Sequence, residues 1–140
     1  AHGYYSRHTT GSRGQSIRIE VRRFRCRQCA STVSCLPSFA QPYHFVNNLT
    51  IQRAFAGLGN YLDVRRNRDL LRRYWNRFVQ WSRRLWLMVR PVAGLLSLRA
   101  SALDVWREFS ASWQNLATCT RRLVHDFHVT CFGQYLCHRC

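Results

Sequence analysis

The sequence contains no lysine and very few acidic residues. All 22 basic residues are arginine and stand against 6 Asp and Glu, so the 140-residue chain has a formal net charge of +16. Such a charge is unexpected for a neutral metabolic scaffold and favours an anionic partner. Arginine presents a planar, permanently charged fork that suits two-pronged contacts with phosphates and base edges. A bias toward GC-rich codons would also exchange lysine for arginine, and both explanations remain open.

The shortage of carboxylates argues against catalysis. The six acidic residues are scattered, and no two of them have the spacing of a two-metal carboxylate site. A nuclease or strand-transfer centre needs about three converging carboxylates. No glycine-rich phosphate-binding loop is present either. We therefore expect a protein that is not an enzyme and has no small-molecule substrate.

Long apolar segments and secretion signals are absent as well. The longest apolar tract, residues 85–98, is interrupted by Arg90 and Pro91 and is shorter than the ~20 residues that a membrane span needs. The first 13 residues are polar and lack the apolar run of a signal peptide. These features predict a cytoplasmic protein without a membrane partner.

The chain is rich in side chains that can form a hydrophobic core. Hydrophobic residues make up 46% of the sequence and include 5 Trp, 8 Phe and 6 Tyr. That content excludes a disordered basic tail. The length allows one domain or two small ones.

The N-terminal part of the chain has the pattern of strands and turns. After a turn at residues 11–14, apolar and charged residues alternate over residues 17–22, which is typical of a strand with one buried and one exposed face. This strand leads directly into the tight turn of the pair Cys26 and Cys29. Two prolines then interrupt residues 30–45, which we expect to form an irregular connector.

Three amphipathic helices are predicted in the rest of the chain. The first begins near Asn48, which can cap it, and its apolar face extends to Leu58. The second covers residues 69–89, carries an apolar stripe at spacings of three and four, and is expected to stop at Pro91. The third is expected to run over residues 101–127 from a capping box formed by a serine and an aspartate.

Arginines gather around the start of the second helix, opposite its apolar stripe. A short helix, a glycine-containing turn and an Arg-rich helix follow each other as in helix-turn-helix proteins, whose second helix enters the major groove. The alternative is a solvated basic face without a partner, but so much charge beside only two carboxylates favours a nucleic acid. The candidate nucleic-acid contacts are Arg65, Arg66, Arg68, Arg72, Arg73, Arg77, Arg83 and Arg84, together with Arg23, Arg25 and Arg27 of the N-terminal part.

The seven cysteines include two C-x-x-C pairs, a spacing that favours a metal site or reduced thiols over a secreted disulfide framework. Cys26, Cys29, Cys137 and Cys140 could together hold a structural zinc ion. The pairs are separated by 107 residues, far more than the ~15–20 of a simple zinc ribbon, so the chain ends would have to meet. Two other interpretations remain: a ribbon whose other half lies upstream of Ala1, or free thiols buried as small apolar groups.

The N-terminal third resembles the zinc-ribbon segment that opens many bacterial insertion-sequence transposases and related uncharacterised proteins. The resemblance lies in the order of the motifs H-G-Y-Y-S-R at residues 2–7, I-R-I at 17–19, R-F-R-C-R-Q-C at 23–29, L-P-S-F at 36–39 and P-Y at 42–43. By resemblance, Cys26 and Cys29 correspond to the second cysteine knuckle of that family. The family's first knuckle and its acidic catalytic core are missing, which leaves the DNA-binding part.

We therefore expect an α+β fold, mainly α, in which a small zinc-ribbon-like β-hairpin precedes a three-helix, helix-turn-helix-like domain. The expected domains are a ribbon segment at residues 1–45, a helical DNA-binding domain at 46–127 and a Cys/His-rich tail at 128–140. The expected function is that of a non-catalytic, transposase-derived, nucleoid-associated protein that binds duplex DNA, with Zn2+ as a candidate structural cofactor. The alternatives are an RNA-binding or ribonucleoprotein component and a helical protein-interaction subunit.

Overall fold

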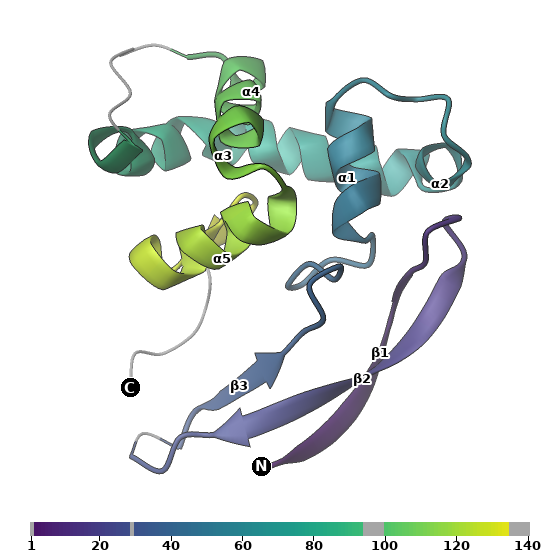
Figure 1. The fold of residues 1–140 in the computed structure, drawn as a ribbon, viewed down its shortest axis with the longest axis vertical. Coiled ribbons are helices and arrows are strands. Elements are labelled where there is room, and N and C mark those ends of the chain that lie inside the picture. Colours follow the sequence, from purple (N-terminus) through teal and green to yellow (C-terminus); the bar gives the residue numbers. More distant parts are fainter. Residues whose placement is uncertain (1, 29, 94–99, 135–140) are drawn as a thin grey trace. The chain divides into compact units, whose positions relative to one another are not determined.

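The computed structural model describes residues 2–28, 30–93 and 100–134, and it confirms an α+β fold that is mainly helical (Figure 1). The elements are β1 (Gly3–Thr10), β2 (Ser16–Arg25), β3 (Thr32–Cys35), α1 (Asn48–Phe55), α2 (Leu62–Arg66), α3 (Arg68–Ala93), α4 (Ala102–Trp113), α5 (Leu116–Phe127), β4 (Val129–Thr130) and β5 (Gly133–Gln134). Of the described helices, none combines the length and the apolar character that crossing a membrane requires.

The chain forms two compact units. The first contains the described residues up to Arg68, and the second runs from Asp69 through β5. The packing groups α1 and α2 with the three-stranded sheet, whereas the expected boundary follows residue 45. The assignment of functions to residues 1–45, 46–127 and 128–140 stays a prediction.

The sheet of the first unit is a meander in the order β1-β2-β3, with both strand pairs antiparallel (Figure 1). Side chains alternate along β2 as predicted. Ile17 and Ile19 are half-buried and Val21 is fully buried, whereas the charged residues between them are exposed. Because successive side chains of a strand point to opposite faces, β1 and β2 together have one covered face and one open face.

The strand β3 corrects the expectation of an irregular connector over residues 30–45. The turn after β2 closes through a 2.8 Å hydrogen bond from the Cys26 N–H to the Ser31 carbonyl. This turn returns the chain alongside β2, where four residues pair with it. With 4 residues, β3 is at the lower limit of the length over which alternation indicates a strand.

The rest of the connector is held by side chains of β1. The Arg7 guanidinium donates hydrogen bonds to the carbonyls of Gln41 and His44. The Thr9 hydroxyl donates to the Phe45 carbonyl at 2.9 Å. The Thr10 N–H also donates to the Phe45 carbonyl, at 2.9 Å, so β1 supplies hydrogen-bond donors to several carbonyls of the connector.

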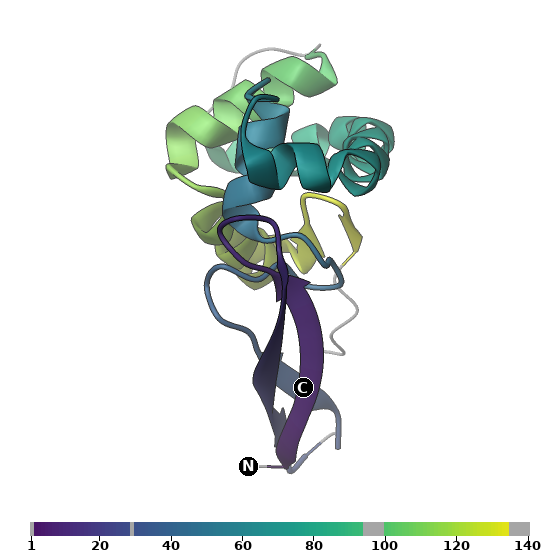
Figure 2. The same cartoon turned by 90° about the vertical axis from the view of Figure 1, so that its right-hand side faces the viewer.

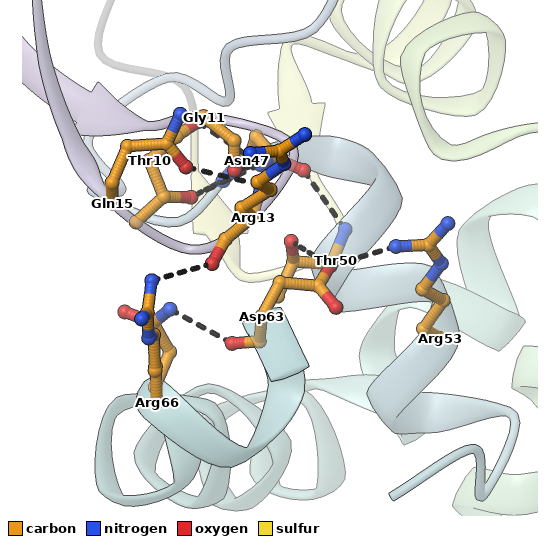
Figure 3. A network of polar contacts seen from close by, with 10 residues as sticks. Thr10, Gly11, Arg13, Gln15, Asn47, Thr50, Arg53, Asp63 and Arg66 are labelled. Carbon is orange, nitrogen blue, oxygen red and sulfur yellow. Dashed lines mark hydrogen bonds and ion pairs between the residues drawn. The ribbon is translucent and has the colours of Figure 1, made fainter. Parts of the chain in front are cut away.

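The first helix begins at a different cap from the one expected. Asn47, and not Asn48, is the N-cap, and its side-chain oxygen accepts the backbone N–H of Thr50 at 2.9 Å. The Asn47 side-chain nitrogen donates to the carbonyls of Thr10 and Gly11, both at 3.0 Å, so the residue joins α1 to the end of β1 (Figure 3). Two adjacent asparagines are equivalent as caps in the sequence, and these tertiary bonds distinguish them.

The helix α1 is also shorter than expected. Ile51 and Phe55 are buried on its inner face, as predicted. Leu58, expected on the same face, lies beyond the last turn and is 47% exposed. Gly57 has a φ of +79°, a left-handed conformation that glycine adopts without strain and that directs the chain away from the helix axis.

The long helix α3 supplies the central part of the second unit. Its predicted stripe is confirmed, with Leu71, Phe78 and Leu85 buried. Pro91, expected to stop the helix, instead lies within it, and α3 is described as far as Ala93. Proline lacks the N–H that would bond to the carbonyl four residues earlier, so here it removes one hydrogen bond of the helix without ending it.

The expected third helix is two helices. Gln114 has a left-handed φ of +60° and separates α4 from α5. Asn115 then caps α5 by accepting the Thr118 N–H at 2.8 Å. The apolar stripe stays in phase across this break because Trp113 and Leu116 are three residues apart, so periodicity alone predicts one helix.

The capping box at the start of α4 is confirmed. The Ser101 hydroxyl accepts the Asp104 N–H at 3.2 Å, and the Asp104 carboxylate accepts the Ser101 N–H at 3.0 Å. Hydrogen bonds from Ser101 lower the pKa of Asp104. The box therefore holds a charged carboxylate at the positive end of the helix dipole.

The described part of the expected tail is a small hairpin that belongs to the core of the second unit (Figure 2). Cys131 and Phe132, at its turn, are 0% and 2% exposed. The Trp81 ring N–H donates to the Thr130 carbonyl at 3.2 Å, and the rings of Phe132 and Tyr74 lie 6.0 Å apart. The hairpin thus covers the half-buried aromatic residues of α3.

We expect Asn47→Ala to lower the free energy of unfolding by about 2–3 kcal/mol, because it removes a helix cap and the hydrogen bonds to the hairpin together. Asn47→Ser keeps a capping oxygen but lacks the nitrogen donor, so it should recover about 1 kcal/mol of the loss. Urea unfolding followed by circular dichroism measures both. A serine variant as stable as the wild type would show that the hairpin bonds contribute nothing.

Candidate nucleic-acid interface

All eight arginines predicted around the second helix are exposed. They divide between the two compact units. Arg65, Arg66 and Arg68 belong to the first unit, and Arg72, Arg73, Arg77, Arg83 and Arg84 belong to the second.

The five arginines of the second unit form one face of α3, which we call the α3 arginine face. At 3.6 residues per turn they cover about 140° of the helix circumference, opposite the buried stripe, over a length of about 18 Å. Asp69 is the only acidic residue in the sequence of α3. Among the described residues, none of the five guanidiniums pairs with a carboxylate. Their charge is therefore available to an external anion.

The arginines of the first unit are positioned by Asp63 on α2. Its carboxylate accepts the Thr50 hydroxyl at 2.7 Å and the Arg53 guanidinium at 3.0 Å, so α2 is fastened to α1 (Figure 3). Arg66 donates to the Arg13 carbonyl at 3.1 Å and is thus partly engaged with the hairpin turn. The exposed Arg65 has no such bond among the described contacts.

Asp63 is only 2% exposed, and yet the pKa of its carboxyl group lies below the ordinary value for aspartate. Burial opposes its ionisation and is the largest single influence on it. The hydrogen bonds from Thr50 and Arg53, with the positive charge of Arg53, outweigh burial and lower the pKa. The carboxylate is therefore charged wherever the fold is intact near neutral pH.

The hairpin turn approaches Asp63 closely. Gly14 has a φ of +77°, and a Cβ atom placed there would lie 2.8 Å from the Asp63 Cα. Only glycine allows the backbone of this turn to adopt that conformation at that distance. The turn, α1 and α2 therefore meet around one buried carboxylate.

The three ribbon arginines differ in their exposure. Arg23 is half-buried on the covered face of the sheet, with its guanidinium 5.5 Å from the Tyr5 ring centre and a 3.0 Å hydrogen bond to Thr32. Arg25 is exposed and donates to the Ala30 carbonyl at 3.3 Å. Arg27, in the turn, is exposed. Arg27 is therefore the most accessible to a ligand, and Arg23 the least.

Sequence reasoning missed the open face of the sheet. Tyr4, Arg22 and Phe24 lie next to one another there and are exposed. The signal that could have found Arg22 and Phe24 is the alternation that located Val21, because residues one step out of phase with it face away from the core.

The described cysteines do not form a metal site. Cys26 is half-buried and Cys35 exposed in the first unit. Within the ranges that the structure describes, no group of three or more His, Cys, Asp or Glu side chains could hold a metal ion. Cys29, Cys137 and Cys140 lie outside the described residues. The four-thiolate site with Cys26 therefore stays a prediction.

The second unit has a separate cysteine pair. Cys119 on α5 and Cys131 in the hairpin turn are both buried, with their sulfur atoms 3.4 Å apart. Burial, together with the neighbouring Cys131 sulfur, raises the pKa of the Cys119 thiol. Cys131 thus packs as a small apolar group, and it belongs to the second unit whereas Cys26 belongs to the first.

Comparison with known proteins assigns a family without assigning a function. Residues 1–74 match the family model described as "Domain of unknown function (DUF6431)". Because the match covers more than half of the chain, the chain belongs to this family. No curated protein and no solved structure matches it. The matched stretch contains the sheet, α1, α2 and the first turns of α3.

We expect Asp63→Asn to lower the free energy of unfolding by about 1–3 kcal/mol at pH 7, because Arg53 loses its anionic partner. The folded-state pKa of Asp63 is lowered, so its stabilising effect is complete above the ordinary carboxyl pKa of about 3.9 and is lost as the pH falls through the folded value. Urea unfolding at several pH values should show the difference from wild type shrinking below about pH 4. Glu20→Gln, an exposed control, should change stability by under about 0.5 kcal/mol throughout. A constant difference down to pH 3 would contradict this role of Asp63.

In the reduced, metal-free protein, we expect a maleimide to label Cys35 and Cys26 rapidly and to spare Cys119 and Cys131 until the protein is unfolded, since the thiolate is the reactive form and burial suppresses it. Peptide mapping by mass spectrometry measures each site. Protection of Cys26 but not of Cys35 by added Zn2+ would support the predicted zinc site. Labelling of Cys119 as fast as of Cys35 would contradict its buried placement.

Proposed function

We propose that the protein is a non-catalytic DNA-binding protein of transposase origin that contacts duplex DNA through the α3 arginine face. The observation that carries the proposal is the set of five exposed guanidiniums that pair with no carboxylate among the described residues and lie opposite the buried stripe. The order of motifs in the ribbon segment supports the transposase origin. Zn2+ as a structural cofactor and association with the bacterial nucleoid belong to the same proposal.

The dimensions of α3 suit the major groove. A helix with its side chains is about 10–12 Å across, and the groove of B-DNA is about 12 Å wide. Arginine makes two-pronged contacts with guanine edges as well as with phosphates. Leu87 lies between these arginines around the helix and is 52% exposed, which places an apolar group where a thymine methyl could be met.

The same geometry favours duplex DNA over the two alternatives. The major groove of A-form RNA is too narrow and deep for side chains to read, so a single basic helix suits DNA better. A helical interaction subunit would expose its tryptophans to the partner. Here all five are buried or half-buried, which removes the main support for that alternative.

We expect binding to a duplex oligonucleotide to weaken with salt, with a slope of log K against log salt near −5 if about six phosphates are contacted. Arg72→Gln and Arg77→Gln should each weaken binding at every salt concentration and reduce the slope by about 1. Fluorescence anisotropy of a labelled duplex measures both effects.

Arg107→Gln is the matched control, because Arg107 is an exposed arginine of α4 outside the α3 arginine face. It should leave affinity and slope nearly unchanged. Salt-independent binding, or no binding to duplex DNA at low salt, would refute the proposal. Equal losses in all three variants would show a general charge effect and would remove the assigned role of α3.

A further inference from the structure

The first unit carries an exposed aromatic surface that the proposed function does not use. It lies on the open face of the sheet and consists of Tyr4, Arg22, Phe24 and Val33, which we call the open sheet face. Tyr4 is 64% exposed, and Phe24 and Val33 are each 38% exposed. The opposite face of the same strands is the covered one, where Val21 is fully buried.

The strand register brings these side chains together. Tyr4 pairs directly with Arg22 across β1 and β2, and Phe24 pairs with Val33 across β2 and β3. The Arg22 guanidinium lies 4.9 Å from the Phe24 ring centre and 6.0 Å from that of Tyr4. Tyr4 and Phe24 are diagonal neighbours in the sheet, and residues in such positions are about 7–8 Å apart. The face thus presents two rings with a fixed positive charge between them.

This arrangement is unusual for a surface that only faces water. Single exposed apolar residues are common and need no explanation. Three apolar side chains in adjacent rows around one arginine form a patch, and none of the three contributes to the covered face of the sheet. The outer face of an antiparallel sheet is ordinarily polar. A ligand with flat apolar groups and negative charge complements such a patch.

We propose that the open sheet face binds unpaired bases of single-stranded DNA. Tyr4 and Phe24 each stack on one base, and Arg22 meets the phosphate between the two nucleotides. This site is additional to the α3 arginine face and has a different ligand. The choice of DNA over RNA rests on the proposed function, because stacking and charge pairing are alike for both nucleic acids.

The charges around the patch are mostly positive. Glu20, on the same face two residues before Arg22, is exposed and repels phosphate. Beyond Phe24 the chain leads to the exposed Arg27 in the turn. Arg18, two residues before Glu20 on the same face, is exposed as well, so Glu20 is the one negative charge of this row.

The test uses labelled oligo(dT) of ten nucleotides, oligo(rU) of the same length and a blunt duplex, each measured by fluorescence anisotropy at low salt. Tyr4→Leu and Phe24→Leu remove a ring but keep an apolar side chain, and each should weaken oligo(dT) binding about tenfold. Glu20→Gln should tighten it about twofold. Duplex affinity should stay unchanged in all three variants.

The matched control is Phe39→Leu, the same replacement at a 44% exposed phenylalanine outside the sheet. It should leave oligo(dT) affinity unchanged, and melting temperatures of all variants confirm that they fold. Unchanged oligo(dT) affinity in Tyr4→Leu and Phe24→Leu, or an equal loss in Phe39→Leu, would overturn the site even if duplex binding holds. Tighter, ring-dependent binding of oligo(rU) than of oligo(dT) would overturn the choice of DNA. Failure of the proposed function is distinguished by absent duplex binding with ring-dependent oligo(dT) binding intact.

Discussion

The first unit depends on the side chain of Asn47. Its oxygen caps α1 through Thr50, while its nitrogen holds the carbonyls of Thr10 and Gly11 at the end of β1. One amide therefore fixes both the start of a helix, where backbone N–H groups lack partners within the helix, and the end of a strand. The ion pair centred on Asp63 then adds α2 to the same junction. With the hairpin tip held in this way, the sheet does not need its outer face for packing, and that face remains open.

Regular patterns in the sequence predict the regular parts of the fold. The alternation along β2, the stripe of α3 and the capping box of α4 are all confirmed, because each depends on neighbours within a few residues. The wrong predictions concern places where contacts between residues distant in the sequence determine the structure. Partners on β1 select Asn47 over Asn48, and a single left-handed residue, Gln114, divides a helix whose stripe stays in phase. Phe132 enters the core through a hairpin too short to leave a periodic signal.

The candidate site likewise has one part that could be predicted from the sequence and one part that could not. The arginines of α3 could be predicted as exposed because they lie opposite an apolar stripe on one helix. Whether each guanidinium pairs with a carboxylate could not be predicted, because that depends on elements that are distant in the sequence. Arg23 shows the difference: the sequence groups it with Arg25 and Arg27, but the phase of β2 directs it to the covered face beside Tyr5. The prediction that Tyr4 lies beside Phe24 on the open sheet face would have required the register of β1 against β2.

The α3 arginine face has a property that a lysine-containing surface lacks. Arginine keeps its proton at every pH at which proteins fold, so the positive charge of this face is constant. Acetylation, which neutralises lysine, has no target in a chain without lysine. Neither a rise in pH within the range where proteins fold nor lysine acetylation can therefore remove the charge of this face. A nucleic acid bound there as proposed would be released by competing ions, by competing nucleic acid or by unfolding.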